Sequence, residues 1–240
     1  MANMYCYVGD LLGFKNIILN LNAEDQSTRV NDWIQFVLDG MKKFNLKEYY
    51  LVSDTIFVGA SASEDGLKNL LRFSKSMLEH GIEKAFPLRG AIAFGDVTWD
   101  EHISYGRAIV DAYNLANNQD WIGTACADKL PHLTSDLWKS GLLIKYLVPM
   151  KRGNELAIIM PTLVWQVPSS KKLIELTSVK GLMGKNEPLN FSLANKIQNT
   201  ILFSSYINRI MSLKLPLWEF QGLLPIEMVT SAPKDIYAFE

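Results

Sequence analysis

The sequence predicts an α/β (α+β) sandwich, in which helices cover a mixed or antiparallel sheet and a helical C-terminal extension follows. The first observation is the element order, which is strand, helix, hairpin, helix, strand, helix and then further strands. The second is the tight hairpin after the first helix, which excludes a doubly wound parallel sheet. The third is a composition shift after Val167, where a polar stretch precedes one more helix. We therefore expect a domain at residues 1–167 and a C-terminal extension at 168–240 that packs on it.

Alternation and spacing predict the elements of the first half. An apolar, aromatic-rich strand lies within 5–14, interrupted by Gly9, Asp10 and Gly13. A helix follows, because apolar residues recur at helical spacing: Val30, Trp33, Ile34, Val37, Leu38, Met41 and Phe44. Residues 49–52 and 56–60 form two short strands that flank an Asp-containing turn.

The remaining elements follow from the same patterns. A second helix covers 67–78 and ends at His80-Gly81, a strand covers 88–97 and a third helix covers 107–117. Further strands are expected at 121–127, 142–148 and 156–165, and the last helix at 192–211. These elements complete one sheet with its covering helices.

Composition excludes several classes of protein. The chain has 240 residues, 24 Lys and Arg against 25 Asp and Glu, and a net charge of −1, so we expect no nucleic-acid partner. The only two cysteines, Cys6 and Cys126, are far apart in the sequence, which excludes a disulfide scaffold. The sequence lacks an HExxH motif, which argues against a zinc hydrolase. No basic leader precedes an apolar segment and no apolar run reaches ~20 residues, so we expect a cytoplasmic protein without a membrane partner.

Two carboxylates are the strongest functional signal. Asp10 and Asp54 each stand at a turn beside apolar strand residues. A carboxylate at the end of a buried strand is costly unless it is paired, hydrogen-bonded or bound to a metal. Two of them on adjacent strand ends are suited to a hard cation, Mg²⁺ or Mn²⁺. The alternative is that each carboxylate only accepts hydrogen bonds from turn amides.

Four short motifs occur in order over about residues 4–165, and each resembles a motif of one enzyme family. Residues 8–14, Val-Gly-Asp-Leu-Leu-Gly-Phe, are similar to the first-strand motif Phe-x-Asp-(Ile/Leu)-x-Gly-Phe. Residues 50–58 around Asp54 are similar to the hairpin Lys-x-x-Gly-Asp-x-x-x-Ala, and 88–96 to Arg-x-Gly-(Ile/Val)-x-x-Gly. Residues 105–112 resemble the Gly-led helix that follows. That family is the class III nucleotidyl cyclases, and the resemblance implies the cyclase fold.

Departures from these motifs bear on the substrate. The purine-reading Lys of the hairpin is Tyr50 here, and the other base-reading position falls on Ile103. The transition-state Asn and Arg of the helix fall, by counting, on Val110 and Asn114. The altered base positions resemble the pyrimidine (uridylate or cytidylate) cyclases of the Pycsar antiphage defence systems. The alternative for Tyr50 is a strand residue packed beside Tyr49.

The resemblance implies that UTP is converted to 3′,5′-cyclic UMP and diphosphate with two Mn²⁺ or Mg²⁺ ions per site. The metals would be held by Asp10, Asp54 and the carbonyl of Leu11. The phosphates would lie under the amides of Gly13, Phe14 and Lys15 and near Lys151, whose alternative is a solvated hairpin turn. The base would contact Tyr50 and Ile103. Arg107 and Asn114 are the further catalytic candidates, although Arg107 also suits a plain surface position.

The resemblance also implies partners. The site would lie between two chains of a homodimer, and the cyclic nucleotide would act on a separate effector protein. UTP is favoured over CTP, because Ile103 supplies no acceptor for the amino group of cytosine. Asn114, Glu101 or Asp111 could supply that acceptor, so cyclic CMP stays an alternative. Two competing hypotheses are a non-catalytic nucleotide-binding module, which typically loses one carboxylate, and another two-metal nucleotidyltransferase, which needs a further acid such as Asp96.

Overall fold

A computed structural model describes residues 2–100, 103–151, 158–166, 191–214 and 221–222 of the chain. The strands in this part are β1 (Ala2–Leu11), β2 (Glu48–Val52), β3 (Thr55–Ser61), β4 (Leu88–Trp99), β5 (Ser104–Tyr105), β6 (Gly123–Cys126), β7 (Leu143–Val148), β8 (Ile158–Leu163) and β9 (Gln221–Gly222). The helices are α1 (Phe14–Asn20), α2 (Ala23–Lys43), α3 (Glu64–Glu83), α4 (Arg107–Asn118), α5 (Ser135–Lys139) and α8 (Phe191–Ser212). Among these described helices, none is both long and apolar enough to cross a membrane.

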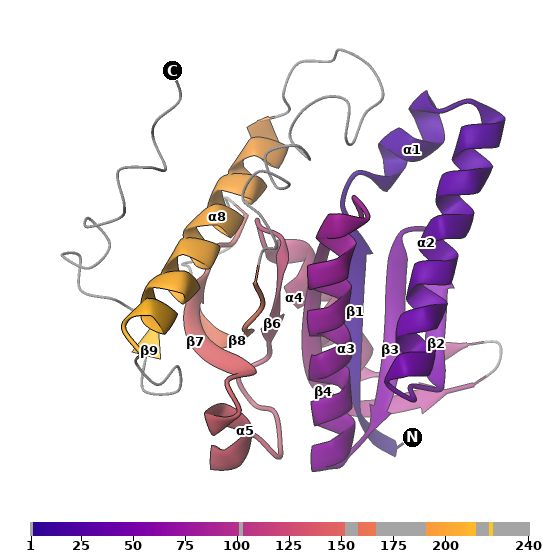
Figure 1. Cartoon of the computed structure of the whole chain (residues 1–240). Coiled ribbons are helices and arrows are strands. Elements are labelled where there is room, and N and C mark those ends of the chain that lie inside the picture. The colour runs from indigo at the N-terminus through magenta and orange to yellow at the C-terminus, as the bar shows by residue number, and fades with distance from the viewer. Residues whose placement is uncertain (1, 101–102, 152–157, 167–190, 215–220, 223–240) are drawn as a thin grey trace, which may run out of the picture.

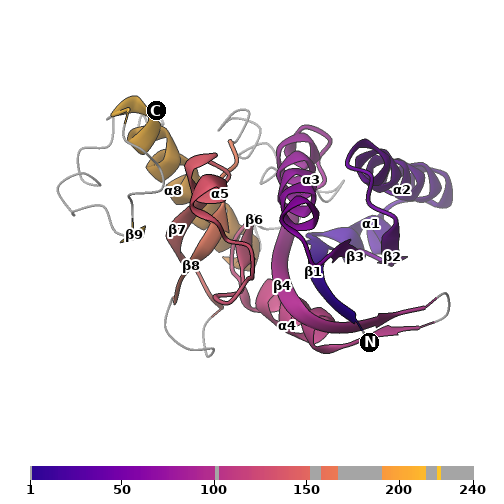
Figure 2. The same cartoon turned by 90° about the horizontal axis from the view of Figure 1, so that it is seen from below.

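The strands form one sheet in the order β2-β3-β1-β4-β6-β8-β7-β9, with β5 paired to β4. β1 is antiparallel to both β3 and β4, whereas β4 and β6 run parallel, because α4 carries the chain back between them. Figures 1 and 2 show α2 and α3 on one face of the sheet and α4 on the opposite face. The mixed, mostly antiparallel sheet between helices confirms the predicted fold class.

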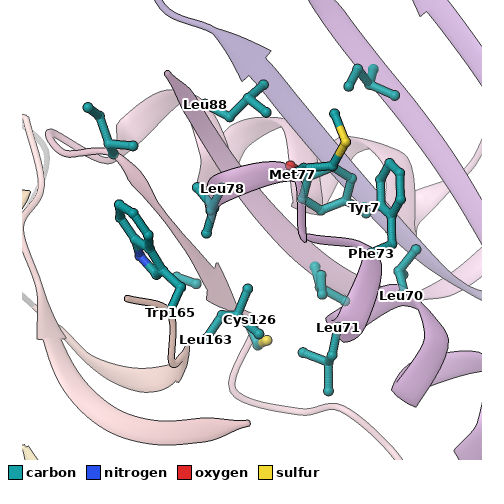
Figure 3. Packing of buried hydrophobic residues seen from close by; sticks show 14 of the residues in the cluster. Tyr7, Leu70, Leu71, Phe73, Met77, Leu78, Leu88, Cys126, Leu163 and Trp165 are labelled. Atoms are coloured by element: carbon teal, nitrogen blue, oxygen red, sulfur yellow. The ribbon is translucent and has the colours of Figure 1, made fainter. Parts of the chain in front are cut away.

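Alternation along β1 separates two apolar clusters. Tyr5, Tyr7 and Leu11 point toward α2 and α3 and belong to the large core. Figure 3 shows part of this core, where Tyr7 lies against Phe73 of α3. Cys6 and Val8 face α4 and belong to a smaller cluster of mostly small side chains. Because Asp10 follows Val8 by two positions, its carboxylate belongs to the α4 face.

The ring of Tyr7 lies close against the backbone of two glycines. Gly9 and Gly90 are direct partners in the β1–β4 pairing. A Cβ atom on Gly9 would lie 2.5 Å from the Tyr7 hydroxyl oxygen, and one on Gly90 would lie 2.6 Å from Cε2 of the same ring. A larger residue at Gly9 or Gly90 would collide with this ring, so packing alone explains why glycines stand beside Asp10 and Arg89.

The helix α8 packs on the half of the sheet that contains β6, β7 and β8 (Figure 1). Phe203 makes edge contacts with Trp121 and Tyr146, at centroid distances of 4.9 and 4.8 Å. Among the residues of this helix whose burial is described, 195–212, the buried apolar ones are Ile197, Phe203, Ile207 and Ile210. The hydroxyl of Thr200 accepts a hydrogen bond from the backbone N–H of Ile122 at 2.9 Å. This segment of the C-terminal region therefore contributes to the same core.

Several element boundaries differ from the sequence expectation. The first strand ends at Leu11, and a seven-residue helix, α1, follows it at once. α3 continues through His80 and Gly81 to Glu83, and Gly81 stands where a Cβ atom would lie 2.5 Å from the carbonyl oxygen of Phe86. β4 runs on to Trp99, where it pairs with β5. α1, β5, α5 and β9 were not predicted, since each is short.

Candidate active site

Backbone pairing brings Asp10 and Asp54 to the same end of the sheet. Asp10 lies opposite Thr55 in the β1–β3 pairing, and the N–H of Leu11 donates to the carbonyl of Asp54 at 2.9 Å. Asp54 occupies the tight β2–β3 turn, where Ser53 adopts a left-handed conformation (φ 58°). The predicted neighbourhood of the two carboxylates thus follows from one hairpin against one strand.

The electrostatics of this pair suit a cation. Burial raises the pKa of Asp54, and the charge of Asp10 raises it further, while hydrogen bonds from its own backbone and from Ser53 oppose the shift. A divalent ion held by both carboxylates would relieve the desolvation and the repulsion together. The described residues contain no cluster of three or more His, Cys, Asp or Glu side chains that could hold a metal. The pair fits an ion that takes its other oxygens from the backbone, water or a phosphate.

Arg89 binds one of the two carboxylates. Its Nη2 lies 2.7 Å from Oδ2 of Asp10, and its side chain is almost fully buried. Nη1 donates to the backbone carbonyl of Gln119 at 3.0 Å, and Nη2 also reaches Oδ1 of Asn117. Arg89 lies opposite Asp10 across the β1–β4 pairing, so the strand register itself fixes the ion pair.

Two lysines extend the positive charge around this end of the sheet. Burial lowers the pKa of Lys151, and the neighbouring charges of Arg89 and Lys196 lower it further, while Asp10 and Asp120 oppose the shift. The N–H of Lys151 donates to the carbonyl of Asn118, which holds it beside the end of α4. Lys151 is thus close to Asp10 within one chain. Its neighbour Arg152 lies outside the described residues.

The predicted phosphate segment lies directly after β1. Gly13 adopts φ 89°, a left-handed conformation that favours glycine, and it is the N-terminal cap of α1. Phe14 begins the helix and is buried, whereas the side chain of Lys15 is exposed. The turn therefore directs the chain away from the strand within a few residues of Asp10.

Of the two predicted base-reading residues, Tyr50 lies on the α4 side of the sheet. Tyr50 is paired with Phe57, which is paired with Val8, so Tyr50 shares a face with Asp10. Its ring stacks on Trp99 at a centroid distance of 5.2 Å, rather than packing beside Tyr49. Ile103, between β4 and β5, is 58% exposed.

The candidates on α4 have exposed side chains. Arg107 forms an exposed ion pair with Asp111 one turn away, at 3.3 Å, and Asn114 is exposed. Both lie on the outer surface of the helix, so a site that used them together with Asp10 would need a second chain. The same surface carries large exposed apolar residues: Ile103, Tyr105, Val110 and Tyr113. Phe57 stacks on Tyr113, which extends this surface onto β3.

We call Asp10, Asp54, Arg89, Asp120, Lys151 and Lys196 the charged group. The sequence analysis assigned no role in a site to Arg89, Asp120 or Lys196. Arg89 did give a signal, because it is a lone charge in the otherwise apolar run from Phe86 to Phe94. Asp120 and Lys196 gave none, since their side chains meet only through the packing of α8, at 3.0 Å between Nζ and Oδ1.

The comparisons with known proteins give a fold likeness. No protein-family model and no curated protein matches the sequence. A monomeric guanylyl cyclase domain of the RhoGC fusion protein from the aquatic fungus Blastocladiella emersonii matches with a TM-score of 0.52 and 13% identity, over 68% of this chain and 95% of that one. The catalytic core of a rhodopsin-guanylyl cyclase with converted specificity, in complex with ATPαS, gives 0.51 and 13%, over 68% and 96%.

A bacterial light-regulated adenylyl cyclase gives a TM-score of 0.51 and 12% identity, over 78% of this chain and 57% of that one. The chain thus has the fold of nucleotide cyclase catalytic domains, as the motifs predicted.

Proposed function

We propose that this chain is a class III nucleotidyl cyclase that converts UTP to 3′,5′-cyclic UMP and diphosphate. The observation that carries the proposal is the meeting of Asp10 and Asp54 at one end of a cyclase-like sheet, with the pKa of Asp54 raised by burial and by Asp10. Two neighbouring, partly buried carboxylates are suited to a divalent cation, which would offset their repulsion and their desolvation.

The reaction joins the ribose 3′-oxygen to the α-phosphorus and breaks the bond from that phosphorus to the oxygen bridging to the β-phosphorus. Two Mg²⁺ or Mn²⁺ ions at Asp10, Asp54 and the Leu11 carbonyl would acidify the 3′-hydroxyl and neutralise the departing diphosphate. Arg89 holds the Asp10 carboxylate in a fixed orientation. The amides of Gly13, Phe14 and Lys15 and the ammonium of Lys151 would bind the phosphates.

A homodimer completes this site in the proposal. The exposed apolar surface of α4, β3 and the β4–β5 connection supports it, because large exposed patches mark protein–protein contacts. A partner chain on this surface would bring its Tyr50, Ile103, Arg107 and Asn114 toward the carboxylates of the first chain. Residues 1–167 would form the catalytic domain, and residues 168–240 an extension packed on it.

The pyrimidine assignment is supported by Tyr50 and Ile103. Tyr50 replaces a lysine suited to purine edges, and its hydroxyl can donate to a carbonyl of uracil. Ile103 is an exposed aliphatic side chain that offers no acceptor to the amino group of cytosine. We further propose that the cyclic UMP is a cytoplasmic second messenger for a separate effector protein in bacterial antiphage defence.

The test is to incubate the purified chain with Mn²⁺ and each of the four nucleoside triphosphates and to identify products by mass spectrometry. We expect cyclic UMP, and with equimolar UTP and CTP an excess of cyclic UMP of about tenfold or more, since a hydrogen-bond mismatch costs ~1–3 kcal/mol. Mainly cyclic CMP would overturn the choice of UTP and keep the cyclase. The absence of every cyclic product would overturn the cyclase.

Changing Tyr50 to Phe should lower kcat/KM for UTP about tenfold, because it removes only the hydroxyl and keeps the ring stacked on Trp99. Tyr49→Phe is the matched control, since Tyr49 is the adjacent residue and points to the opposite face of β2. Steady-state kinetics with UTP and CTP measure both variants. Equal kcat/KM values for the two variants would show that the Tyr50 hydroxyl does not contact the base and that Tyr50 only packs on Trp99.

A further inference from the structure

A continuous path of contacts joins Asp10 to the C-terminal helix. Asp10 is bound by Arg89, whose Nη1 donates to the carbonyl of Gln119. The next residue, Asp120, forms an ion pair with Lys196 of α8 at 3.0 Å, and the side chains are only 19% and 10% exposed. Lys151 lies within electrostatic range of all four charged residues on this path.

The docking of α8 does not depend on this ion pair alone. Asn199 donates from its side chain to the backbone carbonyl of Asp120 at 2.7 Å. Thr200 binds the backbone of Ile122, and Phe203 packs on Trp121. These contacts use backbone atoms and apolar rings, so they persist when the charge of Asp120 or of Lys196 is removed.

A buried lysine needs a compensating charge, which Asp120 supplies to Lys196. Asn199, Thr200 and Phe203 already anchor α8, so anchoring alone gives no reason for a lysine at this position. Among the described residues, Arg89 is paired with Asp10 and Lys196 with Asp120, and Lys151 lies within electrostatic range of all four. A bound polyphosphate would add negative charge to this group. It would be attracted only if the positively charged side chains lay nearer to it than the carboxylates did. Asp120 would then be the member that repels the ligand, while it keeps Lys196 in place beforehand.

We propose that Lys196 is a phosphate-binding residue, supplied by the C-terminal helix, for the triphosphate of the substrate and the diphosphate product. Asp120 holds its ammonium ready in the free protein. α8 is then part of the substrate site as well as part of the fold. The identity of the ligand as a nucleotide rests on the proposed function, whereas the binding of a polyphosphate can be tested without it.

Two substitutions within this one ion pair separate a phosphate role from an anchoring role. Lys196→Met removes the cation and keeps a long apolar side chain, and Asp120→Asn removes the anion and keeps an acceptor oxygen. An anchor predicts that both variants change in the same direction. A phosphate-binding lysine predicts opposite directions. Lys42→Met, at an exposed position of α2, is the control for net charge.

The readout is the affinity of the 240-residue chain for inorganic tripolyphosphate with Mn²⁺, measured by calorimetry, together with KM and kcat for UTP. We expect Lys196→Met to weaken tripolyphosphate binding about tenfold and to raise KM similarly, because a charge-assisted contact is lost. Asp120→Asn should tighten binding about twofold to threefold, and Lys196→Arg should stay within about twofold of the unchanged protein. Lys42→Met should leave the affinity unchanged.

Three results would overturn the proposal: unchanged affinity in Lys196→Met, equal weakening in Lys196→Met and Asp120→Asn, or no binding of tripolyphosphate by the unchanged protein. A protein that makes no cyclic nucleotide but binds tripolyphosphate through Lys196 would refute the proposed function alone. Cyclisation that is indifferent to Lys196 would refute this inference alone.

Discussion

Replacing Asp54 with asparagine should abolish cyclisation and, at the same time, make the metal-free protein more stable. The loss should be about a hundredfold or more in kcat/KM, because a hard divalent ion loses a charged oxygen ligand. The gain has a separate cause, since burial and the charge of Asp10 raise the pKa of Asp54. The folded state therefore disfavours the ionised form, and removing the charge relieves that cost.

The sign of the pH dependence follows from the raised pKa. Below the ordinary pKa of an aspartate, about 4, the residue is protonated in both states and costs nothing. As the pH rises through the higher pKa of the folded state, the unfolded chain is ionised more readily and the fold loses stability. The stability gain in Asp54→Asn should therefore grow from about pH 4 upward and level off once the pH exceeds the raised pKa of the folded state.

Thermal unfolding in a chelator, from pH 4.5 to 8, measures this gain, and Asp111→Asn on the exposed surface of α4 is the control. Mn²⁺ should raise the Tm of the unchanged protein but not that of Asp54→Asn, because only the intact pair binds the ion. A less stable Asp54→Asn at neutral pH would show that the carboxylate serves the turn. Retention of more than a few per cent of activity would contradict its metal role.

The carboxylate pair was accessible to sequence reasoning because both members lie on local elements. Asp54 is fixed by a four-residue hairpin turn, and Asp10 by a strand whose end is marked by glycine. Antiparallel pairing of neighbouring elements then brings them together with little freedom. The strand order β3-β1-β4 joins segments that are distant in the sequence, so the fold class was predicted from the order of the elements and not from this pairing.

The cationic half of the site was less accessible because it depends on distant packing. Lys196 meets Asp120 only after α8 has docked on β6 and β7, through Phe203 and Tyr146. No local pattern encodes that docking. The contact between Tyr50 and Trp99 was missed for a similar reason, since it needs β4 to run two residues beyond the predicted end at Val97.

Arg89 should be the charged residue whose loss costs the most stability. Arg89→Met would leave the Asp10 carboxylate, only 20% exposed, without its cation, and the carbonyl of Gln119 without its donor. Removing one partner of a buried pair costs about 3–5 kcal/mol, and partial exposure of Asp10 reduces this to about 2–4 kcal/mol. Urea unfolding measures the change, with the slope checked for two-state behaviour.

The same substitution at a second Arg–Asp pair separates burial from charge. Arg107→Met breaks the pair with Asp111, in which Arg107 is 77% exposed, and should cost no more than about 0.5 kcal/mol. Adding Asp10→Asn to Arg89→Met should recover at least about 1 kcal/mol, because the stranded carboxylate is then neutral. Equal costs at the two pairs, or no recovery in the double variant, would mean that Arg89 stabilises the sheet by packing alone. The double variant could regain stability and still lack activity. That result would show that the proposed site requires the charges of Arg89 and Asp10.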